Sequence, residues 1–172
     1  MALITSKWML FPATLLIVLV VLYFLGNKSV RSEIVIPASP EQVWSVLMNI
    51  DDYPEWNGVM HLLEGRLKTG NQVKYRFFQD ANSAYEIQSS VKEVVEQQLL
   101  NQGGGMPGVL TFDHRYILEP VATGTKVIIH EQYRGVAVPF WNPAPVEMAY
   151  QRLNQSLHDR VLTLHTEIPE GS

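Results

Sequence analysis

The sequence predicts an α+β domain in which a curved antiparallel sheet wraps around one long C-terminal helix, preceded by a single transmembrane helix. Three observations lead to this fold class: an uncharged segment near the N-terminus, a series of strand-like segments separated by turn residues, and one apolar stripe at helical spacing near the C-terminus. A length of 172 residues suits one folded domain with a core of ordinary size.

The overall composition excludes several classes of protein. A formal net charge of −4, from 13 basic and 17 acidic residues, argues against nucleic-acid binding, which needs a basic face. The sequence contains no cysteine, which excludes disulfide frameworks, thiol nucleophiles and zinc sites with cysteine ligands.

The N-terminal segment has the pattern of a membrane anchor. No charged residue lies between Lys7 and Lys28, and a helix of about 20 residues is about 30 Å long, enough to cross the hydrocarbon core. We therefore expect residues 1–27 to be a single-pass anchor that places the protein in a membrane. A cleaved signal peptide is the alternative, but no small-residue cleavage site follows the apolar run. Positive charges flank both ends, so they do not choose the side of the membrane.

Residues 28–172 are expected to form one domain that begins with a strand and a helix. The segment 30–36 is short and rich in β-branched residues, which favours a strand. Ser39 can cap a following helix, Pro40 fits its first position, and Gln42 completes a capping box. A short second helical turn is expected at residues 53–57.

The middle of the chain, from residue 61 to residue 135, is strand-like throughout. Glycine, proline and asparagine clusters, including Gly103–Gly105, supply the expected turns. The segments enriched in β-branched and aromatic residues are 73–78, 84–95, 109–119 and 125–136. Four or more strands joined by short turns favour an antiparallel sheet over βαβ units.

The last element is a long amphipathic helix. Its apolar stripe consists of Val146, Tyr150, Leu153, Leu157, Val161, Leu164 and Ile168, and Pro169 should end it. This stripe must be buried against the concave face of the sheet.

Two ionisable residues, His114 and Glu131, interrupt the apolar faces of the last two strands. Alternation places His114 on one face with Leu110, Phe112, Tyr116 and Leu118, and Glu131 on one face with Val127, Ile129 and Tyr133. If the two strands form a hairpin, the two side chains lie within a few residues' register of each other. Glu131 could be a structural contact of Tyr116, Tyr75 or a backbone amide. The pair could also bind a polar group of a ligand, or serve as an acid/base pair.

The candidate ligand-binding residues are those expected to face the space between the helix and the sheet. They are Trp56, Tyr75, Phe77, Phe112, His114, Tyr116, Ile129, Glu131, Tyr133, Tyr150, Leu153 and Leu157, and ordinary core packing is the alternative role for most of them.

Several apparent motifs do not carry a function. Residues 103–108 fit G-x-G-x-x-G, but a strand rather than a helix is expected to follow, so phosphate binding is rejected and the role of Gly103–Gly105 stays open. No zinc-binding H-E-x-x-H and no G-x-S-x-G nucleophile elbow is present, and we expect no metal and no cofactor.

The chain resembles the START-like helix-grip (SRPBCC) superfamily, and within it the polyketide cyclase/dehydrase and lipid-transport group. The resemblance spans residues 30–166. It is carried by Ile36-Pro-Ala-Ser-Pro-Glu-Gln-Val-Trp44, Tyr53-Pro-Glu-Trp56, His114-Arg-Tyr-Ile-Leu-Glu-Pro120 and His130-Glu-Gln-Tyr-Arg-Gly135. It implies about seven strands wrapped around the helix, with a cavity for a lipid, sterol, polyketide, quinone or similar molecule.

Three functions follow as hypotheses. The first is a membrane-anchored domain that binds, and could transfer, a hydrophobic small molecule such as a lipid or quinone. The second is a cyclase- or dehydratase-like enzyme that uses Glu131 and His114 for proton transfer, which would require polar groups converging on one point. The third is a non-catalytic interaction module with a closed cavity and an exposed apolar patch. The sequence favours the first, because few polar groups fall on the predicted inward faces.

Overall fold

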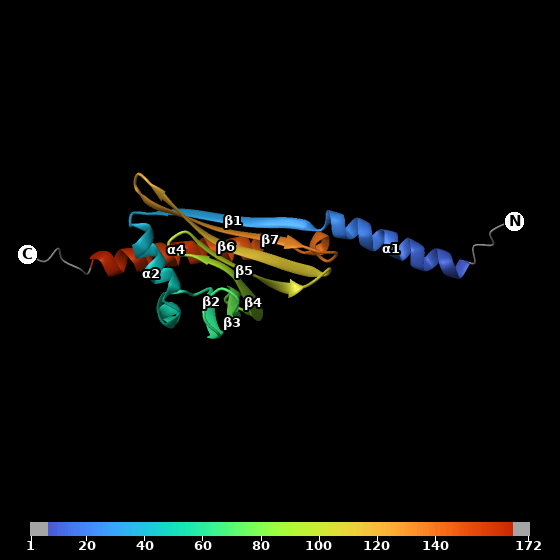
Figure 1. Ribbon diagram of the computed structural model, residues 1–172, viewed down its shortest axis with the longest axis horizontal. Helices are drawn as coiled ribbons and strands as arrows, with labels where there is room; N and C mark the ends of the chain where they lie inside the picture. Colours follow the sequence, from blue (N-terminus) through green and yellow to red (C-terminus); the bar gives the residue numbers. More distant parts are fainter. Residues whose placement is uncertain (1–6, 167–172) are drawn as a thin grey trace, which may run out of the picture.

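The protein is represented by a computed structural model, which describes the backbone of residues 7–166 and the side chains of residues 11–164. A sheet curves over α4, and α1 extends away from the domain (Figure 1). The helices are α1 (Lys7–Leu25), α2 (Pro40–Met48), α3 (Tyr53–Trp56) and α4 (Ala144–Thr166), with two 3₁₀ turns, η1 (Ile50–Asp52) and η2 (Val138–Phe140). The strands are β1 (Asn27–Ile36), β2 (Met60–Glu64), β3 (Gln72–Asp80), β4 (Ser83–Val95), β5 (Leu99–Met106), β6 (Leu110–Val121) and β7 (Gly124–Arg134).

All neighbouring strands are antiparallel, and they form one seven-stranded sheet in the order β1-β7-β6-β5-β4-β3-β2. Strands β2 to β7 follow one another along the chain, and β1 joins the far edge through β7. The predicted antiparallel sheet is confirmed. The four strands predicted in the middle of the chain, between residues 73 and 136, correspond to β3, β4, β6 and β7.

Helix α4 buries its apolar stripe against the sheet, as the spacing predicts. Tyr150, Leu153, Leu157 and Val161 are buried in the same core as residues of β1, β3, β6 and β7. Leu164 is half-buried against this core. The end of the predicted stripe, Ile168, and Pro169 lie outside the described residues.

The predicted start of α2 is confirmed in detail. The Gln42 backbone N–H donates to Ser39 Oγ at 3.3 Å, and the Ser39 backbone N–H donates to Gln42 Oε1 at 2.8 Å. This reciprocal capping box satisfies two backbone donors that the first helical turn leaves free. The short helical turn predicted after it is α3.

The first strand begins earlier than the sequence predicts, at Asn27 instead of residue 30. The reason is that β7 is long enough to pair with Asn27 through Arg134. The Gly135 backbone N–H then donates to the Gly26 carbonyl at 3.0 Å. Gly26 is therefore the whole connection between α1 and β1.

The turn predicted at Gly103–Gly105 is wrong, because these glycines lie inside β5, between β4 and β6. A Cβ on Gly104 would lie 2.9 Å from Phe112 Cζ and would also collide with the Gln88 carbonyl oxygen. Only glycine fits there, so close packing explains a residue type that otherwise indicates a turn. The turn itself follows β5, where Gly108 has a φ of 79°.

Among the residues that the structure describes, no helix is both long enough and apolar enough to cross a bilayer. The transmembrane helix expected over residues 1–27 is therefore not supported, and residues 1–6 of that segment lie outside the described part.

The burial of α4 against the sheet predicts a large effect of one truncation. Leu157→Ala should lower the free energy of unfolding by about 2–5 kcal/mol, because Leu157 is fully buried and its removal leaves a cavity. Denaturant unfolding of the full chain, followed by tryptophan fluorescence, measures this. Met148→Ala on the exposed face of the same helix is the matched control and should change stability by less than about 0.5 kcal/mol. Equal effects of the two variants would contradict the predicted packing.

Candidate functional site

His114 and Glu131 lie side by side in the core, on β6 and β7. Their Cα atoms are direct partners in the antiparallel register, which confirms the proximity predicted from the sequence. Both side chains are buried, and His114 Nδ1 lies 3.9 Å from Glu131 Oε1. Two ionisable groups are thus held together beneath α4.

Two tyrosine hydroxyls, rather than the partners considered from the sequence, bind the Glu131 carboxylate. Tyr133 on β7 and Tyr150 on α4 both donate to Glu131 Oε2. Tyr75 instead donates to Gln102 Oε1 at 2.7 Å, and the Tyr116 hydroxyl contacts the sulfur atom of Met60. The carboxylate therefore joins the sheet to the helix.

The hydrogen-bond pattern indicates which ring nitrogen of His114 carries a proton. His114 Nδ1 lies 3.2 Å from the Tyr150 hydroxyl, whose single proton is donated to Glu131. Tyr150 can therefore only accept from His114, so Nδ1 carries a proton. In the neutral imidazole, Nε2 is then an acceptor, and this buried atom has no hydrogen-bond partner within the described part of the chain.

Burial keeps the tyrosines of the site protonated. Burial, together with the charge of Glu131, raises the pKa of Tyr150 and of Tyr133 far above the usual value. Burial likewise raises the pKa of Tyr116 and of Tyr75. All four hydroxyls therefore stay available as hydrogen-bond donors over the physiological pH range.

The space beside this cluster is small. A cavity of about 20 Å³ is lined by Met60, Tyr75, Ile87, Ser89, Gln102, Phe112, His114, Glu131 and Tyr150. That volume holds about one water molecule. The ligand-sized cavity that the family resemblance implies is therefore closed in this conformation.

The structure brings five of the predicted site residues to this cavity: Tyr75, Phe112, His114, Glu131 and Tyr150. The others do not line it. Phe77, Tyr116, Ile129, Leu153 and Leu157 are core residues, and Tyr133 reaches the cluster through its hydroxyl. Trp56 borders a separate surface pocket with Arg160, so it does not cap this cavity.

Sequence reasoning missed four lining residues, Met60, Ile87, Ser89 and Gln102. Ile87 and Ser89 alternate on the inner face of β4, a signal that could have been used. Gln102 pairs with His114 in the sheet. The sequence did not indicate this position, because the glycines that follow Gln102 predicted a turn instead of a strand.

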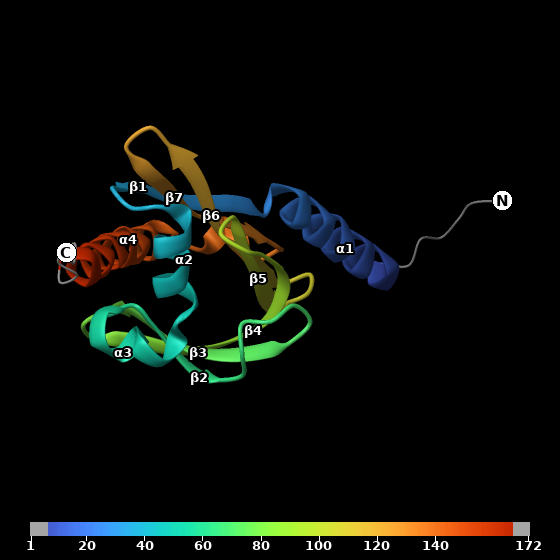
Figure 2. The same cartoon turned by 60° about the vertical axis from the view of Figure 1, so that its left-hand side comes forward.

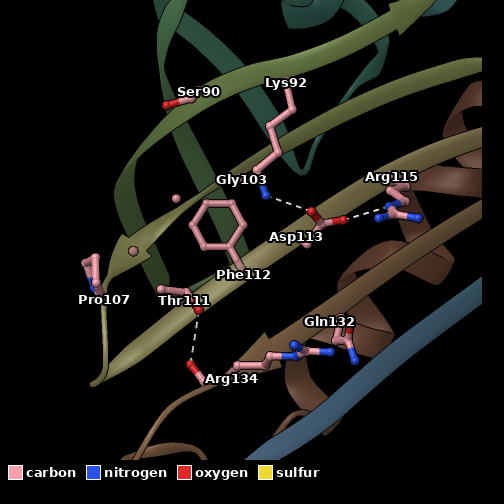
Figure 3. A pocket seen from close by; sticks show the side chains of 12 residues that line it. Ser90, Lys92, Gly103, Pro107, Thr111, Phe112, Asp113, Arg115, Gln132 and Arg134 are labelled. Atoms are coloured by element: carbon pink, nitrogen blue, oxygen red, sulfur yellow. Dashed lines mark hydrogen bonds and ion pairs between the residues drawn. The ribbon is translucent and has the colours of Figure 1, made fainter.

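A second and larger hollow lies on the opposite face of the sheet from α4, with a volume of about 620 Å³ (Figure 3). Asp113 lies there between two cations, 2.7 Å from Lys92 Nζ and 2.6 Å from Arg115 Nε. Asp113 compensates one of these two positive charges at the surface, where such ion pairs contribute little to stability. Among the described residues, no group of three or more His, Asp or Glu side chains could hold a metal ion.

The sequence matches the protein family described as "Polyketide cyclase / dehydrase and lipid transport" over residues 27–162. No curated protein sequence is significantly similar to the chain.

Many solved structures share the fold. A protein of unknown function from Staphylococcus aureus is 15% identical, with a TM-score of 0.63 over 81% of this chain and 96% of its own. A protein from Rhodobacter sphaeroides is 15% identical, with a TM-score of 0.65 over 80% of this chain and 93% of its own. DynU16, a protein of the dynemicin biosynthetic locus, is 18% identical, with a TM-score of 0.58 over 78% of this chain and 47% of its own. Likeness at this level of identity shows the fold alone.

The buried tyrosines predict how stability depends on pH. Five of the seven tyrosines have a raised pKa in the folded chain, namely Tyr53, Tyr75, Tyr116, Tyr133 and Tyr150. Above about pH 10 the unfolded chain loses phenolic protons that the folded chain keeps, so stability should fall as pH rises, by about 1.4 kcal/mol per pH unit for each such group. Tyrosinate absorbance during alkaline titration should show these five ionising only as the chain unfolds. Ionisation of more than two tyrosines in the still-folded chain would contradict this, and Tyr85→Phe should leave the late-ionising number unchanged.

Proposed function

The chain belongs to the polyketide cyclase/dehydrase and lipid transport family, and we propose that it binds a small hydrophobic molecule between α4 and the sheet. A polar group of the ligand would face His114. The observation that carries this proposal is the buried Nε2 atom of His114, a residue that lines the cavity; no described residue forms a hydrogen bond with this atom. A buried polar atom without a partner costs about 1–3 kcal/mol, which a ligand can recover.

The hydrogen-bond pattern also indicates the chemistry of the ligand. In the neutral form of the imidazole, with Nδ1 donating to Tyr150, Nε2 is an acceptor, and a ligand hydroxyl or N–H group matches it best. The apolar side chains of Met60, Ile87 and Phe112 supply the rest of the lining. A molecule with an apolar body and one donor group fits this combination. A cavity of about 20 Å³ must widen to admit it.

We also propose that α1 holds the domain at a membrane. From residue 11 onward most of its apolar side chains are exposed. The large exposed ones are Phe11, Leu15, Leu16, Ile17, Val18, Leu19, Val20, Val21, Tyr23, Phe24 and Leu25. Such a surface favours insertion into lipid. With Gly26 as the only linker, the domain would lie directly against the bilayer, where a poorly soluble ligand is concentrated.

A second candidate function is proton transfer in an enzyme of the cyclase or dehydratase kind. The convergence of Glu131, His114 and Tyr150 in one hydrogen-bonded group favours it, because acid/base chemistry requires such a cluster. In this candidate His114 Nε2 would exchange a proton with the ligand, and Glu131 would stabilise the charged imidazole. Binding at His114 is common to both candidates.

The role of His114 predicts how much ligand the protein retains. The full chain is purified in detergent and transferred to amphipol, and its organic extract is examined by mass spectrometry. A discrete small molecule should be enriched with the wild type and reduced about tenfold or more in His114→Phe, which removes the acceptor but keeps an aromatic ring. His130→Phe is the matched control, since His130 neighbours Glu131 on β7 but faces outward; it should retain the molecule.

An extract that is identical for all three proteins would contain only lipid bound around α1 and would contradict the site. It would then favour the interaction-module hypothesis, which also requires a closed cavity.

The exposure of α1 predicts how the chain associates with lipid. The full chain should float with phosphatidylcholine vesicles in a density gradient. The double variant Leu16→Glu and Val20→Glu should stay at the bottom, since each charge costs about 2–3 kcal/mol or more in lipid. Leu63→Glu, an exposed apolar position of β2, is the control and should float. Flotation of the double variant would show that α1 does not hold the domain at lipid.

A further inference from the structure

The sheet is split at one end, between β4 and β5. The two strands pair from Val95 and Leu99 to Ser89 and Gly104, and the pairing stops there. Beyond that point, residues 83–88 of β4 pair only with β3, and the end of β5 pairs only with β6. A gap in backbone pairing of this kind can be closed only by side chains.

The ring of Phe112 closes this split from β6. Phe112 is the register partner of Gly104, and two of its ring carbons lie 2.9 and 3.0 Å from where a Cβ on Gly104 would be. The carbonyl oxygen of Gln88 on β4 borders the same position. The ring therefore crosses β5 above the glycine and reaches the edge of β4. Gly104 allows this crossing because it has no side chain, which gives the glycine stretch of β5 a role.

Two hollows meet at this ring. The internal cavity beside His114 and a surface groove of about 600 Å³ share three lining residues, Ile87, Ser89 and Phe112. Only one layer of side chains therefore separates the two spaces, and Phe112 is the largest member of that layer. A half-buried phenyl ring can turn without breaking a hydrogen bond, since it makes none.

The groove opens at the end of the domain from which α1 leaves. It is bordered by Met106, which is 64% exposed and precedes the β5–β6 turn. The Val136 backbone N–H donates to Gly108 in that turn at 3.1 Å, next to the bond between Gly135 and Gly26. In both overall views the β5–β6 turn lies on the α1 side of the domain (Figures 1 and 2).

From these observations we infer that Phe112 is the gate of an entrance between β4 and β5, and that the ligand is a membrane-dissolved amphiphile with a hydroxyl group. The ligand would leave the lipid beside α1, pass Met106, displace the ring of Phe112 and place its hydroxyl against His114. When the ring turns away, the groove and the cavity become one space, which explains how a closed cavity admits a ligand. The gate rests on the proposed binding function and adds a route and a ligand class to it.

The gate is tested by binding kinetics of the full chain in phosphatidylcholine nanodiscs, with 1-pyrenebutanol as the probe. Energy transfer from tryptophan to pyrene reports binding in a stopped-flow experiment. Phe112→Ala should raise the binding rate about tenfold, because it removes the barrier at the ring. The release rate should rise at least as much, because the ring also lines the cavity and its contact with the bound ligand is lost. Phe112→Leu, which preserves burial better, should give an intermediate increase and covers the case in which the alanine variant does not fold. Leu110→Ala, on the same face of β6, is the control and should keep wild-type rates.

The possible outcomes distinguish a failure of the proposed gate from a failure of the proposed binding function. Saturable binding to the wild type with unchanged rates in both Phe112 variants would overturn the gate and leave the proposed function standing. Absence of saturable binding in the wild type would overturn both.

The direction of the entrance is tested with bromine-labelled phosphatidylcholine, which quenches tryptophan on contact. The emission added by Met106→Trp should be lost in brominated nanodiscs. The emission added by Val121→Trp, at the opposite end of β6, should persist. Equal quenching at the two positions would overturn an entrance that faces the lipid.

Discussion

The Glu131 carboxylate is the group that constrains the rest of the structure. A carboxylate beneath α4 is costly unless several donors satisfy it, and Tyr133 and Tyr150 do so from the sheet and from the helix. This requirement fixes the rotation of α4, because Tyr150 must face β7 while Leu153 and Leu157 face the core. The polar cluster and the apolar stripe thus specify one and the same placement of the helix.

The same contact would make the proposed binding site and the helix interdependent. Tyr150 accepts from His114 and donates to Glu131, so a ligand bound at His114 would act directly on the bond that holds α4. A fully satisfied buried network is stable, but among the described residues His114 Nε2 has no hydrogen-bond partner. Because His114 lines the cavity, the polar group of the proposed ligand could complete the network there.

The sequence is sufficient to predict the parts of this site that depend on periodicity. Alternation along β6 and β7 places His114 and Glu131 on the inner face, and a short turn between the strands brings them together. Helical spacing likewise places Tyr150 in the stripe. Two features depend instead on side-chain contacts that periodicity does not specify: the bonds of Glu131 to Tyr133 and Tyr150, and the glycines of β5. Gly104 looks like a turn residue locally, and only the ring of Phe112 explains why it lies in a strand. The volume of the cavity could not be predicted either, because side-chain packing and not the fold sets it.

The junction between α1 and the domain would give the proposed entrance a defined direction. A flexible linker would let the domain turn freely, but here one residue connects α1 to β1. The Lys28 ammonium donates to the carbonyl oxygens of Pro139 and Trp141, at 3.2 and 2.6 Å, and so ties the start of β1 to η2 and the residue after it. Charge-assisted bonds of this kind are stronger than neutral ones. The β5–β6 turn, which carries the Met106 edge of the groove, lies on the α1 side of the domain. If α1 lies in lipid as we propose, a ligand concentrated there would meet the Phe112 side of the sheet first.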